Sequence, residues 1–153
     1  MRCCDFNQAV DNLPKNLTHL NFGFYFNKPV HNLPKNLIHL TFNMCYKQPI
    51  YNLPQKLNYL DLFYYRNNDI ILPTKIKELC LFCNNNLINN LPEHIEILHI
   101  YFSANTKNVH NLPTTLKEII VEKEKYLKYI KIPFGTKISF TPLHICTFKT
   151  PTF

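Results

Sequence analysis

Apolar positions repeat along the chain at a fixed spacing. The stretch Leu33–Phe42 begins with a leucine-proline pair, and apolar residues follow four, seven and nine places after the leucine. The same arrangement starts at Leu-Pro pairs along most of the sequence, at Leu13, Leu33, Leu53, Leu72, Leu91 and Leu112, and an Ile-Pro pair follows at Ile132. Steps of 19 to 21 residues are typical of a solenoid, in which each coil contacts only its neighbours.

The spacing within one repeat predicts a short strand. Leu40 and Phe42 are two residues apart, so on a strand both point inward and Thr41 between them points outward. One such strand per coil builds a parallel sheet. Proline lacks an N–H for a sheet ladder. The recurring leucine-proline pair therefore suits the return segment, the part of each coil that connects one strand to the next, and it argues against long helices there. The pattern predicts a β-rich solenoid with one short parallel strand per coil of about 20 residues and little helix.

Three regions follow from the pattern. Residues 1–12 are expected to be a partial N-terminal repeat or cap, because Phe6–Val10 matches Phe26–Val30 one period later. Residues 13–131 hold the six Leu-Pro coils, and residues 132–153 an atypical coil and tail, with Ile138 and Phe140 on a last strand. The first complete coil has no full upstream neighbour, so we expect a monomer or weak self-association through this edge.

Aligning the coils places three sets of side chains on the outward face of the sheet. The slot between the two inward positions holds Asn21, Thr41, Asp61, Cys80, His99 and Ile120. The slot before it holds His19, His39, Tyr59, Glu78, Ile97 and Glu118, and the slot after it holds Gly23, Asn43, Phe63, Phe82, Tyr101 and Glu122. The rings of Tyr59, Phe63, Phe82 and Tyr101 either form an exposed contact surface or pack on one another along the ladder.

The residues of this face suggest two chemical interpretations. Asp61, Cys80 and His99 share one slot, but a Cys-His-Asp relay needs the acid beside the histidine, and Asp61 lies on the far side of Cys80. Cys80 and Cys83 have metal-ligand spacing. On a straight strand, however, Cys83 points inward and the two thiols diverge, unless the strand ends at Phe82. A metal or thiol protein using Cys80, Cys83 and His99 stays an alternative. We predict no enzyme, no metal site and no cofactor.

Composition limits the kinds of partner and the cellular compartment that we expect for this protein. The formal net charge is +7, but the basic residues are spread along the chain without interleaved aromatic residues, so we expect no nucleic-acid partner. No apolar run reaches the ~18 residues of a membrane span, so we expect no membrane partner. No secretory signal follows Met1, so the six cysteines are expected to be reduced thiols in the cytoplasm.

The pairing of Leu-Pro-x-x-Leu-x-x-Leu-x-Phe with Phe-Asn-x-Pro-Val/Ile resembles the FNIP repeat, over about residues 6–121 and most cleanly over Leu33–Ile50. The resemblance implies a leucine-rich-repeat-like fold and an origin in amoebae or their large DNA viruses, hence the host cytoplasm for a viral protein. In this family the repeats are often joined to an F-box, which docks a ubiquitin ligase. The 12 residues before Leu13 are too few for one, so an F-box would come from another chain.

The sequence thus predicts a non-catalytic protein-protein interaction module whose protein partner it does not identify. The resemblance implies an alternative, in which this chain is the substrate-recognition part of a ubiquitin-ligase assembly. The predicted contact residues lie in the aromatic middle of the outward face and at its border: Tyr59, Phe63, Glu78, Phe82, His99 and Tyr101.

Overall fold

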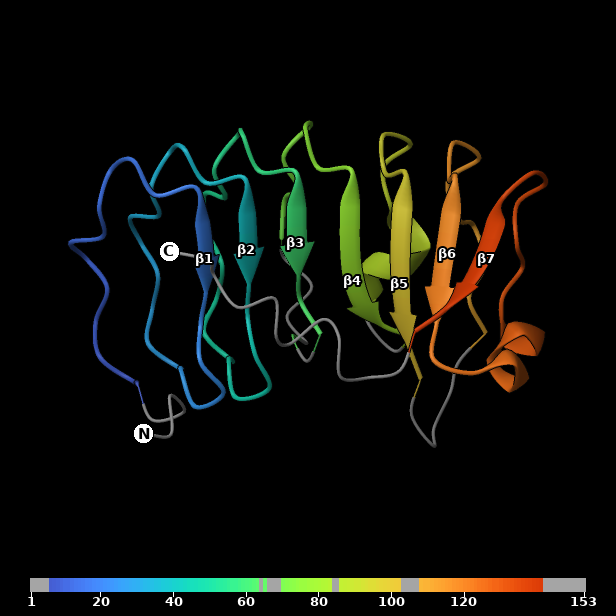
Figure 1. Ribbon diagram of the computed structural model, residues 1–153, viewed down its shortest axis with the longest axis horizontal. Helices are drawn as coiled ribbons and strands as arrows, with labels where there is room; N and C mark the ends of the chain where they lie inside the picture. The colour runs from blue at the N-terminus through green and yellow to red at the C-terminus, as the bar shows by residue number, and fades with distance from the viewer. Residues whose placement is uncertain (1–5, 64, 66–69, 84–85, 103–107, 142–153) are drawn as a thin grey trace.

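One parallel sheet runs the length of the molecule (Figure 1). The computed structural model describes residues 6–63, 65, 70–83, 86–102 and 108–141. Its seven strands lie side by side in chain order. They are β1 (His19–Asn21), β2 (His39–Thr41), β3 (Tyr59–Asp61), β4 (Glu78–Phe82), β5 (Ile97–Tyr101), β6 (Glu118–Val121) and β7 (Lys137–Phe140). The predicted β-rich solenoid with one short strand per coil is confirmed, and the last strand includes Ile138 and Phe140.

Helix is limited to two short 3₁₀ segments among the described residues. They are η1 (Asn86–Asn90) and η2 (Glu124–Tyr129), both in return segments. The second begins in the charged stretch after β6, where the apolar spacing of the earlier coils is lost. The prediction of little helix is therefore confirmed for the described part of the chain.

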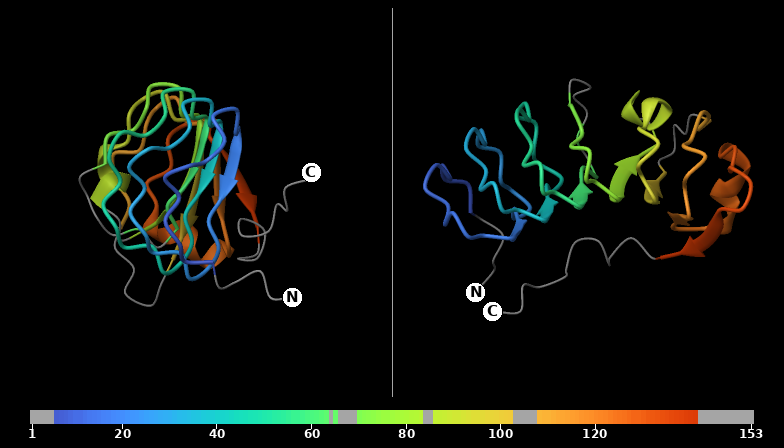
Figure 2. Two further views of the ribbon diagram at one scale, coloured as in Figure 1. Left: turned by 90° about the vertical axis from the view of Figure 1, so that its left-hand side faces the viewer. Right: turned by 90° about the horizontal axis from the view of Figure 1, so that it is seen from above.

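The stack of coils is curved. Seen from above, the strands lie along the inner side of an arc and the return segments fan out along its outer side (Figure 2). The sheet thus has one face toward the return segments, where the core lies, and one face toward the inside of the arc. We call the second the sheet face.

Each leucine-proline pair begins a tight turn that leads into the next strand. The carbonyl of Pro34 accepts the backbone N–H of Leu37 at 3.1 Å, and Pro54 does the same for Leu57 at 3.1 Å. The bond recurs from Pro14 to Pro133, with distances between 3.0 and 3.3 Å. Proline supplies a carbonyl here and needs no N–H, so the same residue can open every coil without leaving a backbone donor unpaired.

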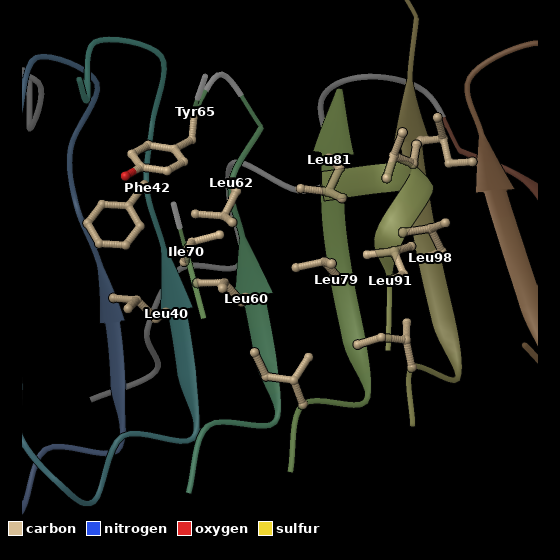
Figure 3. Close-up of a cluster of buried hydrophobic side chains, with 14 of the residues drawn as sticks. Leu40, Phe42, Leu60, Leu62, Tyr65, Ile70, Leu79, Leu81, Leu91 and Leu98 are labelled. Carbon is tan, nitrogen blue, oxygen red and sulfur yellow. The ribbon is translucent and has the colours of Figure 1, made fainter. Parts of the chain in front are cut away.

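The core is built from columns of equivalent side chains (Figure 3). Leu40, Leu60, Leu79 and Leu98 stand in register on consecutive strands, and each is 0% exposed. Complete burial of one such side chain stabilises a fold by ~1.5–3 kcal/mol. Because each column runs through all the coils, most of this burial exists only between neighbours, as in other solenoids.

Asparagine side chains bridge the return segments of neighbouring coils. Asn7 accepts the backbone N–H of Asn27 at 2.9 Å through its Oδ1 atom, and Asn27 in turn accepts that of Lys47 at 2.9 Å. The ring of Phe6 stacks on Phe26 with centroids 6.1 Å apart. Residues 6–12 therefore take the place of a return segment under the first coil, as the match between Phe6–Val10 and Phe26–Val30 predicts.

Candidate functional site

The predicted contact residues come from β3, from the turn after it, and from β4 and β5. The strand register pairs Tyr59 with Glu78, and it pairs Asp61 with Cys80 and Cys80 with His99. Phe82 is paired with Tyr101 at the ends of β4 and β5. The register confirms the slot of Tyr59 and the slot of Asp61 along all the coils, and it confirms the third slot at Phe82 and Tyr101. The period of the repeat alone therefore brings these side chains together on the sheet face.

A second apolar cluster lies on this face, separate from the core. It consists of Phe63, Cys80 and Tyr101, with Tyr59 and Phe82 packed against it; we call these five residues the aromatic cluster. The ring of Phe63 meets that of Tyr101 edge-on at 4.3 Å and that of Phe82 edge-on at 5.0 Å. Edge-to-face contacts at these separations are favourable because the positive ring edge meets the negative ring face.

Burial within the aromatic cluster corrects one of the sequence expectations. Phe63 is 6% exposed and Tyr101 is 4% exposed, while Tyr59 and Phe82 are partly exposed. An exposed stripe of all four rings is therefore wrong, and the alternative, in which the rings pack on one another, is confirmed. Sequence spacing fixes the direction of a side chain on a strand, but it does not show how far large neighbouring rings cover each other.

Three polar residues of this face are also buried. Thr41 is 8% exposed, Asp61 1% and His99 8%. The Nε2 atom of His99 lies 2.7 Å from Oε1 of Glu78, whose side chain is 30% exposed. Glu78, which comes from the slot before the one that holds His99, is thus the acid beside the histidine, and Asp61 instead accepts the N–H of Phe63.

The two candidate thiols belong to opposite sides of the sheet. Cys80 is 0% exposed in the aromatic cluster, and its Sγ atom lies 3.3 Å from the hydroxyl oxygen of Tyr59. Cys83 is 2% exposed and belongs to the main core. The two thiols thus belong to different apolar clusters, although β4 ends at Phe82. A thiol buried to this degree is also unsuited to attack an external substrate.

Two histidines extend the face toward the N-terminal coils. The rings of His19 and His39 stack with centroids 4.5 Å apart, and His39 stacks on Tyr59 at 5.2 Å. His19 is exposed and His39 partly exposed. Sequence reasoning placed both on this face but not among the contact residues. The signal was present, because they occupy the slot of Tyr59 in the two preceding coils.

Carboxylates toward the C-terminal coils are held ionised by cations and hydroxyls. A hydrogen bond from Ser139 and a second one from Lys137 lower the pKa of Glu118. Glu96 is clamped between Lys117 and Lys77, and hydrogen bonds from these two lysines lower its pKa to about 2. On the sheet face, the aromatic cluster therefore lies between the stacked histidines of β1 and β2 and the ion pair of Glu118 with Lys137.

Two features are absent from the described part of the chain. Within it, no group of three or more His, Cys, Asp and Glu side chains is placed to hold a metal ion. The same residues include no helix that is long and apolar enough to cross a membrane.

Comparison with known proteins agrees with the fold. A solved crystal structure, that of the giant-virus protein CroV588, described as a novel circular LRR protein, matches 78% of this chain with a TM-score of 0.59 and 32% sequence identity. The chain spans about a fifth of that protein, since the match covers 20% of it. A search of curated proteins found no match. The class is thus a leucine-rich-repeat-like solenoid.

The family model of the FNIP repeat matches residues 6–32 and 26–65. These segments include Leu33–Ile50, the repeat that is cleanest in the sequence. Residues 6–65 of this chain therefore carry FNIP repeats. The matched segments end at residue 65, whereas the coils continue through β7, which ends at Phe140.

Proposed function

We propose that this chain is a non-catalytic protein-binding module that holds a protein partner against the sheet face over β3, β4 and β5. The observation that carries the proposal is the aromatic cluster, which lies on the face of the sheet away from the core. Apolar side chains on that face are not needed to fill the core. Aromatic residues are enriched at the centres of protein interfaces because they offer a wide, stiff contact area.

Different members of the predicted contact set have different roles in this proposal. Tyr59 and Phe82 are partly exposed, so they would touch the partner. Phe63 and Tyr101 are buried, so they would hold the other two rings in place. This arrangement lowers the entropy cost of binding, because side chains that are already packed lose little freedom when a partner arrives.

The pair formed by Glu78 and His99 lies at the border of the aromatic cluster. Its 2.7 Å contact gives this side of the surface a polar rim. Rim charges mainly steer and select partners rather than hold them. His39, stacked on Tyr59, would extend the surface toward the N-terminal coils.

The test is a comparison of captured complexes. Tagged wild-type protein, a Tyr59→Ala/Phe82→Ala variant and a Tyr51→Ala control would be purified from the native cell, and the bound proteins identified by mass spectrometry. Tyr51 suits the control because it is a 56% exposed aromatic residue in a return segment. We expect one or more proteins to be retained by the wild type and the control and lost from the double variant. Retention by the double variant at an unchanged level would contradict the proposal.

The same capture experiment tests the ubiquitin-ligase alternative. FNIP repeats are present, and an F-box from another chain would make this solenoid the substrate-recognition part of an assembly. Co-purification of an F-box protein would support that finer function. A retained partner without any F-box protein would leave the simpler binding module as the function.

A further inference from the structure

The two ends of the described stack present different surfaces. At the N-terminal end, residues 6–12 lie as a return segment under the first coil, and no described strand belongs to that segment because β1 begins at His19. At the C-terminal end, β7 is the last described strand, and the structure describes only Thr141 after it. Among the described residues, the first element of the stack is thus a return segment and the last is a strand.

Both end surfaces carry apolar side chains that are more exposed than those at the same positions inside the stack. Phe140 is 51% exposed, whereas its register partner Val121 is 1% exposed. Phe6 is 48% exposed, whereas Phe26, on which it stacks, is 1% exposed. Leu20 in β1 and Ile138 in β7 are partly exposed, whereas Leu40, which has the same inward position in β2, is 0% exposed. These are the positions that a further coil would cover.

The backbone of each end strand also has groups directed away from the sheet. Along a parallel strand, successive residues direct their N–H and C=O groups to opposite neighbours. Phe22 donates its N–H to Thr41 in β2, so His19 and Asn21 direct theirs to the outer edge of β1. Lys137 and Thr141 donate to residues of the β6 coil, at 2.9 and 3.0 Å, so Ile138 and Phe140 direct theirs to the outer edge of β7.

We propose that copies of this chain associate head to tail, with β7 of one copy pairing in parallel with β1 of the next. In this arrangement residues 6–12 of the second copy provide the return segment for the coil of β7. Ile138 then continues the column of Leu20, and Phe140 covers Phe22. The partner at each end is a second copy of the chain. The reason is that the two end surfaces are the two sides of the contact that already joins every consecutive pair of coils in the chain.

Such a contact uses different surfaces on the two copies. Heterologous contacts of this kind build closed rings or open filaments rather than symmetric dimers. The sheet face lies on the inner side of the arc (Figure 2) and does not take part in the contact. The proposal is thus independent of partner binding at the aromatic cluster.

The first experiment is sedimentation velocity of the wild-type protein from micromolar to several hundred micromolar concentration. We expect the mean mass to rise with concentration, either toward the mass of a closed ring or through a series of increasingly large oligomers. A monomer throughout this range, or a dimer that grows no further, would overturn the proposal. Tyr51→Asp, a change at an exposed position away from both ends, is expected to behave as the wild type.

The second experiment uses one variant at each end. Phe6→Asp and Phe140→Asp each place a carboxylate at one end surface and leave the other intact, so each variant alone is expected to remain monomeric. Mixed together, they are expected to form one-to-one heterodimers and nothing larger, because one intact end of each kind remains. A mixture that stays monomeric while the wild type associates, or variants that associate alone as the wild type does, would contradict the head-to-tail arrangement.

The third experiment uses two variants at a fully exposed position, where a substitution does not disturb the packing of the folded protein. Phe134 is 105% exposed and follows Pro133 as Lys15 follows Pro14, so it would lie beside Lys15 of the next copy. Phe134→Lys is expected to weaken association and Phe134→Asp to strengthen it, with about a twofold to tenfold difference that shrinks at high salt. Equal association constants for the two variants would contradict the proposed register.

Discussion

The carboxylate of Asp61 accepts a hydrogen bond from the backbone N–H of Phe63 at 2.9 Å, and Asp61 is only 1% exposed. An aspartate that binds the N–H two residues later stabilises a turn at that point. Here the bond holds the chain as it leaves β3 and orients Phe63 into the aromatic cluster. Asp61 is thus a structural residue of the sheet face, whereas its sequence slot predicted only that the side chain points outward.

Replacement of Asp61 by alanine should therefore destabilise the protein. We expect Asp61→Ala to lower the free energy of unfolding by ~1–3 kcal/mol, because it removes the acceptor of a buried N–H. Asp61→Asn keeps an oxygen acceptor of the same length and should lose less. Urea denaturation of the three proteins measures the difference. If Asp61→Ala and the wild type unfold at the same urea concentration, the bond has no structural role.

Sequence reasoning predicted the direction of the side chains on the sheet face well and their burial poorly. The repeat period fixes which residues share a slot, so the alignment of Asp61, Cys80 and His99 followed from counting. Burial depends on how the rings of Phe63 and Tyr101 turn toward each other across neighbouring coils. That choice is made among side-chain rotamers, and no spacing rule contains it.

The same reasoning missed the contacts that cross between slots. The bond between His99 and Glu78 joins two different slots on adjacent strands, so an alignment that compares residues only within one slot does not pair them. A sequence search for such pairs would need to compare each residue with its diagonal neighbours. The N-terminal end surface, in contrast, was indicated by the match of Phe6–Val10 with Phe26–Val30.

The position of a leucine along the stack should set the cost of removing it. Leu60 is 0% exposed in the middle of its column, whereas Leu20 has the same slot in β1 and is partly exposed. We expect Leu60→Ala to cost ~2–5 kcal/mol, because it leaves a cavity between coils. Leu20→Ala should cost clearly less, since one side of this residue lacks a neighbouring coil. Calorimetry of both variants at low protein concentration checks the order, and equal losses would contradict the role of stacking.

Removal of one hydroxyl group should stabilise the core. The hydroxyl of Tyr46 is buried and has no hydrogen-bond partner among the described residues. Burial, and next the neighbouring Tyr65, raise the pKa of Tyr46. An unpaired buried hydroxyl costs ~1–3 kcal/mol, and phenylalanine keeps the ring stacked between Phe26 and Tyr65. We expect Tyr46→Phe to raise the melting temperature by a few degrees, and a lower melting temperature would show that the hydroxyl is bound in solution.

The clamped carboxylate of Glu96 should make stability depend on acid pH. Hydrogen bonds from Lys117 and Lys77 lower the pKa of Glu96 from its ordinary value of 4.5 to about 2. A carboxyl group with a lowered pKa in the folded state contributes stability that is present above about pH 4.5 and is lost as the pH falls toward 2. We therefore expect the difference in urea midpoint between the wild type and Glu96→Gln to be largest above this range and to fade through it.

Two controls separate this effect from general acid denaturation. Glu124→Gln changes an exposed carboxylate in η2 and should leave the pH profile of the wild type unchanged. In 1 M salt the difference between the wild type and Glu96→Gln should shrink at neutral pH, because exposed charges are screened over about 3 Å at that ionic strength. A difference that is constant from pH 7 to pH 2 would mean that Glu96 stabilises the fold by packing and not by its charge, since packing contacts do not titrate.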